Sequence, residues 1–133
     1  MTAGEAPAAP FAPGSHMIAA HGGGGFAFAG MRHGGSILAT PIGVRPLAAA
    51  SVDALDRRTL ASLFDELAER PGSIEFLVIG TGERLAPAPE RLRAALREAG
   101  LRFETMATGP ALRVYNVMQS EDRRVAAALI AAP

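Results

Sequence analysis

A glycine-rich turn after a predicted buried strand is the feature whose residue types best suit ligand chemistry. It consists of Gly80, Thr81, Gly82, Glu83 and Arg84. A turn of this kind, beyond the carboxyl end of a strand in an open α/β sheet, can hold an anion through backbone N–H groups. A dinucleotide-binding turn would carry a third glycine soon afterwards, and a Walker loop would carry a lysine, which the sequence lacks. A plain tight turn is therefore favoured, with nucleotide binding as the alternative.

A second Thr-Gly pair, Thr108 and Gly109, follows the next predicted strand. If the two strands are parallel neighbours, both turns lie at the same edge of the sheet. Glu83, Arg84 and the first turn of the following helix would then border one cleft, which predicts a modest anion or peptide pocket. The simpler interpretation is that Thr108 caps the helix and that glycine permits the turn.

Tyr115 and Asn116 are the only tyrosine and the only asparagine of the chain. Asparagine is a poor residue for a helix interior, so we expect its amide to bond to a specific partner. A structural role, tying this helix to the Thr-Gly turns, is favoured over direct ligand contact. The residues of the candidate ligand or partner cleft are Gly80, Thr81, Gly82, Glu83, Arg84, Thr108, Gly109, Tyr115 and Asn116.

The histidines do not complete a catalytic or metal-binding set. His21 and His33 flank a glycine-rich segment, and no acidic residue lies near either of them in the sequence. A metal site needs three or four converging ligands, and a triad needs a nucleophile, a base and an orienting acid. We therefore expect no catalytic residue, no metal and no cofactor. A protein that is not an enzyme is favoured, with an enzyme as the alternative.

Composition restricts the classes of partner. The chain has 13 basic and 13 acidic side chains, so its formal net charge is zero, and it has no cysteine. A nucleic-acid-binding protein of this size would show a basic excess. The longest apolar stretches are far shorter than the roughly 20 residues that span a bilayer. These features predict a cytoplasmic protein without nucleic-acid partner or transmembrane segment.

The elements that must position these residues follow the order ββαβαβαβ, which predicts an α/β domain with a mixed sheet. Residues 17–50 predict two strands that form a hairpin. Asp56 can cap a first helix, whose apolar residues recur at helical spacing and include Leu60 and Leu63. The remaining elements are a strand over 74–79, a helix after Pro89 that ends before Gly100, a strand over 101–107, a helix from about Pro110 and a strand over 123–131.

The length of 133 residues suits a single core. We expect a flexible Ala/Pro-rich arm over residues 1–16 and one domain over 17–133. Gly14 to Met17, at the junction of the arm and the domain, has the sequence that a cleaved purification tag leaves behind. A tag remnant is therefore the alternative to a native segment.

Several of these motifs together resemble a small α/β domain family that includes the mitochondrial NADH dehydrogenase (complex I) assembly factor 3 and many bacterial and archaeal proteins. The resemblance rests on Gly25 to Phe28, Val78 to Gly82, Met106, Thr108-Gly109, Ala111 and Tyr115-Asn116. It runs from about Met17 to Ala131. It implies a three-layer fold with a five-stranded mixed sheet whose last strand is antiparallel to the others, and no established catalytic residue.

The family's best-described role implies a function in the assembly of a membrane-bound respiratory complex. Many relatives have a tryptophan near the position of Leu47, and this chain has none. The leading hypothesis is a non-enzymatic protein that binds a membrane-complex subunit or an assembly protein, in the cytoplasm or at the inner-membrane surface. The alternative is a small-ligand or nucleotide-binding protein that uses the cleft beside the two Thr-Gly turns.

Overall fold

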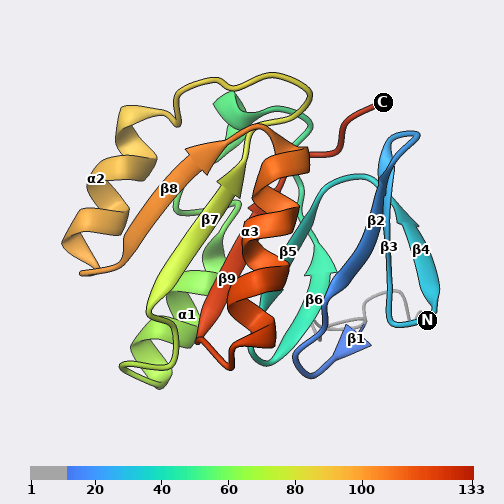
Figure 1. The fold of residues 1–133 in the computed structure, drawn as a ribbon. Helices are drawn as coiled ribbons and strands as arrows, with labels where there is room; N and C mark the ends of the chain where they lie inside the picture. Colours follow the sequence, from blue (N-terminus) through green and yellow to red (C-terminus); the bar gives the residue numbers. More distant parts are fainter. Residues whose placement is uncertain (1–11) are drawn as a thin grey trace, which may run out of the picture.

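A computed structural model describes residues 12–133 and shows a mixed α/β fold (Figure 1). In this range nine strands form two sheets, and three α-helices and one short 3-10 helix accompany them. The strands are β1 (Ala12–Pro13), β2 (Ile18–Gly22), β3 (Gly25–Phe28), β4 (Met31–Gly34), β5 (Ile37–Thr40), β6 (Gly43–Pro46), β7 (Phe76–Gly80), β8 (Arg102–Met106) and β9 (Val125–Leu129). The helices are η1 (Val52–Ala54), α1 (Ala61–Glu69), α2 (Glu90–Glu98) and α3 (Thr108–Ser120).

The larger sheet has six strands in the order β1-β6-β5-β9-β7-β8, which confirms a mixed sheet but not the expected five strands. The prediction that the last strand is antiparallel to the others was wrong. β9 runs parallel to β7, with Phe76 opposite Val125, and antiparallel only to β5. The reason is α3, because a helical crossover returns the chain to the starting end of the sheet before β9 begins.

The first part of the chain contains more strands than the predicted single hairpin. β2, β3 and β4 form a separate antiparallel sheet, and β5 and β6 form a second hairpin. The glycine-rich segment after His21 forms the turn between β2 and β3, because Gly23 and Gly24 have φ of +59° and +80°. A two-residue turn with positive φ at both positions matches the twist of a hairpin.

The predicted arm over residues 1–16 begins in residues 1–11, which lie outside the described residues. Ala12 and Pro13 form β1, which pairs with β6 through Ala12 opposite Val44. Ala12 is buried. The short β1 therefore occupies one end of the six-stranded sheet.

Two apolar clusters fill the spaces on the two faces of the six-stranded sheet. α1 and α2 cover one face, and α3 with the β2-β3-β4 sheet covers the other (Figure 1). Alternate residues of β7 illustrate the division, since Leu77 and Ile79 belong to one cluster and Val78 to the other. β9 lies in the middle of the sheet, and all five of its residues are buried.

Helix ends follow the predicted residues only in part. Gly100 follows α2 with φ +75°, as its predicted position after the helix requires. Asp56 does not cap α1 itself, because its Oδ1 accepts hydrogen bonds from the N–H groups of Arg58 and Thr59, in the turn before the helix. α3 starts at Thr108 rather than near Pro110, so the residue at the N-cap position is Ala107 and not the predicted Thr108.

Candidate functional site

The two Thr-Gly turns meet where the parallel strands β7 and β8 end, which confirms that these strands are neighbours. The N–H of Gly82 donates to Thr108 Oγ1 at 2.9 Å, and the N–H of Thr108 donates to the carbonyl of Gly82 at 2.8 Å. The N–H of Thr81 donates to the carbonyl of Met106 at 2.9 Å. Direct hydrogen bonds therefore join the two turns.

Both threonine hydroxyls are fully used within the protein. The Thr81 hydroxyl donates to the carbonyl of Arg84 at 2.7 Å and accepts from the N–H of Ala86 at 3.1 Å. The buried Thr108 hydroxyl donates to the carbonyl of Ile130 at 2.7 Å. Each side chain thus holds a loop or a strand end in place.

Gly80 is required by close packing at the same position. A Cβ atom at Gly80 would lie 2.9 Å from Leu129 Cδ2 and 3.1 Å from Thr108 Cα. A real Cβ contact is essentially never as short as the first of these distances. The glycine that the sequence suggested for ligand contact therefore permits α3 to start against the end of β7.

The remaining predicted residues around the turns are more accessible. Glu83 and Arg84 are exposed, and Gly109 is half-buried in the first turn of α3. A Cβ atom at Gly109 would lie 3.3 Å from Nε2 of His21 and 3.9 Å from Nη1 of Arg113. The structure thus brings a histidine from β2 and an arginine from α3 to this helix start, which the sequence did not predict.

We had expected Tyr115 and Asn116 to tie α3 to the Thr-Gly turns. They tie it instead to β2 and to the residues just before β2. The amide of Asn116 makes two hydrogen bonds to the backbone of Ile18, accepting from its N–H and donating to its carbonyl, both at 2.8 Å. The Tyr115 hydroxyl donates to the carbonyl of His16 at 2.8 Å. Burial of the phenol raises the pKa of Tyr115 to about 12.

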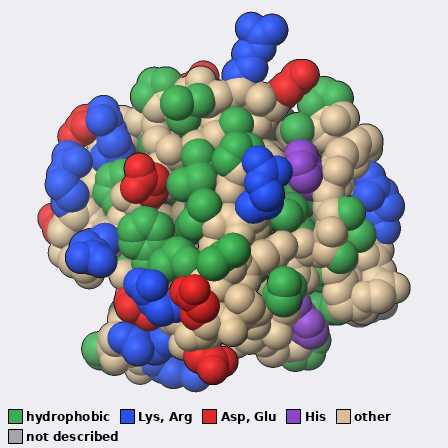
Figure 2. Space-filling view, in the orientation of Figure 1, with side chains coloured by type: hydrophobic (Ala, Val, Ile, Leu, Met, Phe, Trp, Pro, Cys, Tyr) green, Lys and Arg blue, Asp and Glu red, His purple; other side chains and the backbone are tan. Residues whose placement is uncertain are grey.

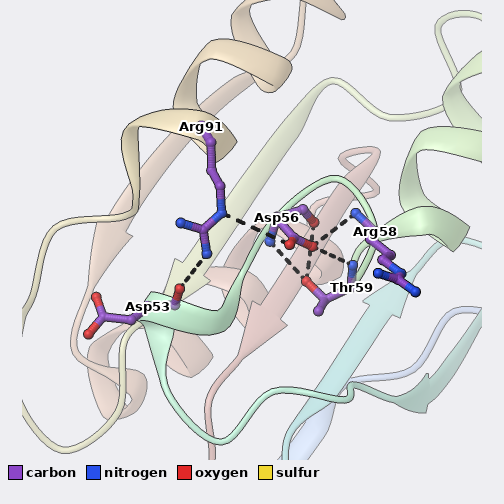
Figure 3. A network of polar contacts seen from close by, with 5 residues as sticks. All are labelled: Asp53, Asp56, Arg58, Thr59 and Arg91. Carbon is purple, nitrogen blue, oxygen red and sulfur yellow. Dashed lines mark hydrogen bonds and ion pairs between the residues drawn. The ribbon is translucent and has the colours of Figure 1, made fainter.

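A polar cluster connects η1, the turn before α1 and α2 (Figure 3). Arg91 donates to the carbonyl of Asp53 at 2.6 Å, and its Nε lies 3.9 Å from Oδ2 of Asp56. Hydrogen bonding from the N–H of Thr59 is the main cause that lowers the pKa of Asp56. A surface cavity of about 450 Å³ lies beside this cluster and is lined by Asp56, Arg57, Arg58, Arg91, Ala94, Ala95 and Glu98.

The contacts of this cluster explain its role. Arg91 and Asp53 are 38 residues apart, and no local pattern in the sequence predicted their contact. Because the guanidinium of Arg91 bonds to a backbone carbonyl and lies near a carboxylate, it fixes α2 against the turn before α1. We therefore interpret the cluster as a structural junction.

An apolar surface lies between α3 and β8, and we call it the α3–β8 surface. It comprises Phe76, Met106, Val114, Val117 and Met118. Val117 has an exposed fraction of 56%, and the other four are half-buried. Figure 2 shows apolar side chains gathered over this part of the molecule. The surface exists because α3 covers β7 and β9 and leaves the same side of β8 open.

Two further findings concern residues 12–133. No three side chains of histidine, aspartate or glutamate in this range are arranged to hold a metal ion. None of the helices described there has the length and hydrophobicity needed to cross a membrane.

The chain is similar to proteins of known sequence and structure. The sequence signature of a family described as "Protein of unknown function (DUF498/DUF598)" matches residues 18–130. An uncharacterized protein of Rhodobacter capsulatus is 34% identical over 131 residues, which cover 96% of this chain and 94% of that protein. The crystal structure of an outer membrane protein from Bartonella henselae has a TM-score of 0.84 and 39% identity, covering 92% of this chain and 99% of that one.

A more distant similarity covers only part of a longer protein. NADH dehydrogenase (ubiquinone) 1 alpha subcomplex assembly factor 3 of Xenopus tropicalis is 39% identical over 69 residues. The matched region is 52% of this chain and 36% of that protein.

Proposed function

The chain belongs to the DUF498/DUF598 family, and on this premise we propose that it is a non-enzymatic protein that binds subunits or assembly proteins of a membrane-bound respiratory complex. The similarity to a protein named as an NADH dehydrogenase assembly factor supports this class of partner. The α3–β8 surface is the observation that carries the proposal. Its five side chains are apolar and come from three elements of the fold, with Phe76 on β7, Met106 on β8 and the other three on α3.

The α3–β8 surface suits a protein partner better than a small ligand. An exposed apolar area rimmed by polar residues is typical of a protein interaction site. Arg102 and Glu104 lie on the same side of β8 as Met106, and both are exposed. They would form the polar rim of an interface whose apolar centre is on α3.

The Thr-Gly turns are less suited to be the centre of the site. Their hydroxyls and the N–H groups of Thr81, Gly82 and Thr108 already bond within the protein. A ligand there would have to use the exposed Glu83 and Arg84. We therefore place the partner on the α3–β8 surface and not at the turns.

Site-specific photo-crosslinking tests this assignment. A photoreactive amino acid would replace Val117 in one variant and Arg70 in a matched control, because Arg70 is exposed on the opposite side of the sheet. After irradiation in cells, crosslinked proteins would be identified by mass spectrometry. We expect subunits or assembly proteins of a respiratory complex from position 117 only. Equal products at both positions, or no such protein at position 117, would contradict the proposal.

A further inference from the structure

The outer edge of β8 is the free end of the six-stranded sheet. No strand among residues 12–133 pairs with this edge. The N–H of Thr81 donates to the carbonyl of Met106, so the backbone groups of Met106 point toward β7. Because successive residues of a strand alternate the edge to which their N–H and C=O point, Phe103 and Thr105 direct theirs outward. No hydrogen bond within the described residues uses these outward groups.

A continuous groove follows this edge on the side of α2. It is made of three adjoining cavities of about 510, 380 and 370 Å³. The first and second share Arg97 and Phe103 as lining residues, and the second and third share Pro87 and Thr105. Leu85, at one end of the groove, has an exposed fraction of 67%. The edge therefore has both unpaired backbone groups and space beside them, which are the two requirements for adding a strand.

The charged side chains of β8 select one pairing with a second copy of the chain. In a symmetric antiparallel pair, a two-fold axis passes through one residue, which then faces itself. An axis at Phe103 places Arg102 opposite Glu104 of the second copy, twice. An axis at Glu104 would place two glutamates opposite each other, and an axis at Arg102 two arginines. Only the first of these three registers pairs opposite charges, and opposite charges across strands stabilise a pair.

We infer that this chain forms a two-fold dimer in which β8 pairs with β8 of a second copy, antiparallel and centred on Phe103. The two sheets then become one continuous sheet. The two Phe103 residues exchange a pair of hydrogen bonds, and Thr105 N–H of each copy donates to Leu101 C=O of the other. The N–H of Leu101 is not available, since it donates to the carbonyl of Leu96 at 3.0 Å.

The side chains fit the same arrangement. Arg102 and Glu104 occupy a position that is not hydrogen-bonded to the second copy, where opposing side chains approach most closely. The Phe103 rings lie on the other face, in the groove beside α2. Leu85 lies where the second copy's residues before Arg102 would pass. This inference does not rest on the proposed function, because it is argued from the backbone edge and the charges of β8 and not from the apolar side chains of the α3–β8 surface. Arg102 and Glu104, which border that surface in a single chain, face the second copy in the dimer.

A charge swap tests both the dimer and its register. The molar mass of the full chain would be measured by light scattering during size-exclusion chromatography, over a range of loading concentrations. We expect it to rise with concentration from 13.7 kDa towards twice that value. Arg102→Glu and Glu104→Arg, made singly, place like charges opposite each other at both symmetric positions. Each single variant should raise the dissociation constant of the dimer by about tenfold or more.

The double variant Arg102→Glu with Glu104→Arg restores opposite charges and should restore the dimer. Arg70→Glu and Glu121→Arg carry the same charge changes at exposed positions away from β8 and should leave the dimer unaffected. Thr105→Pro removes an outward N–H without removing a bond to β7, and should abolish the dimer.

Three results would overturn the inference. The first is a single-chain mass at every concentration, which would mean that the charges on β8 act only to prevent strand addition. The second is a dimer that neither single charge reversal weakens. The third is a double variant that stays as weakly associated as the single variants while its circular dichroism spectrum matches that of the unmodified protein.

Discussion

Replacement of Asn116 by alanine should destabilise the protein by about 2 kcal/mol, a large share of a typical stability of about 5–15 kcal/mol. The substitution removes two hydrogen bonds of 2.8 Å to the backbone of Ile18. Ile18 has an exposed fraction of 0%, so its N–H and C=O would lose partners in a place that water reaches poorly. Each lost bond costs about 1 kcal/mol, with a further cost for an unsatisfied buried group.

The expected value includes an opposing effect. Alanine is better than asparagine inside a helix by about 0.7 kcal/mol, which offsets part of the loss. Asn116→Asp provides a sharper comparison, because aspartate keeps an acceptor for the N–H of Ile18 but loses the donor. Its carboxylate would also face the carbonyl of Ile18, so this variant should be at least as unstable as the alanine variant.

Urea unfolding followed by circular dichroism measures these differences. Gln119→Ala is the matched control, because Gln119 lies on the same helix and its side chain bonds to Ser15 at an exposed site. We expect the control to change the free energy of unfolding by less than about 0.5 kcal/mol. Faster hydrogen exchange in β2 would locate the effect of Asn116→Ala. If Asn116→Ala were as stable as the control, the bonds to Ile18 would not hold α3 to β2.

Two further predictions concern packing and ionisation. Gly80→Ala should lower the free energy of unfolding by about 1–3 kcal/mol, because its Cβ would clash with Leu129 and Thr108. Gly34→Ala is the control in the same urea assay. It should be nearly neutral, because a Cβ at Gly34 meets no atom within 4 Å. Tyr115, the only tyrosine in a chain without tryptophan, should titrate by ultraviolet absorbance near its raised pKa of about 12. Because the folded state favours the protonated phenol, stability should fall as the pH rises from 10.0 towards 12, and a midpoint near 10.0 in the folded protein would contradict the buried position.

Sequence patterns predicted the elements whose signals are local. The helical spacing of Leu60 and Leu63 located α1, and Gly100 marked the end of α2. The alternation of strands and helices after residue 50 predicted parallel neighbours, as β7 and β8 are. Such features depend on periodicity and turn chemistry within a few residues, which a single sequence contains.

Other features depend on contacts between distant parts of the chain. The orientation of β9 follows from where α3 returns the chain, and nothing in Val125 to Leu129 itself encodes it. The partner of Asn116 is 98 residues away in the sequence, so the amide predicted a specific bond but not its recipient. The two Thr-Gly turns were correctly brought to one edge of the sheet, but their mutual hydrogen bonds required the three-dimensional arrangement.

The position of β9 has a consequence for synthesis on the ribosome. β9 pairs with β5 on one side and β7 on the other, and no other strand among the described residues connects these two halves of the sheet. Among the strands of residues 12–133, it is also the last to be made. Until it leaves the ribosome, the nascent chain can form hairpins and helices but cannot close its sheet, and the backbone N–H and C=O groups on the facing edges of β5 and β7 stay unpaired. The six-stranded sheet therefore closes only once β9 has been made and has folded between β5 and β7, and the unpaired edges of these two strands are most open to wrong association before that step.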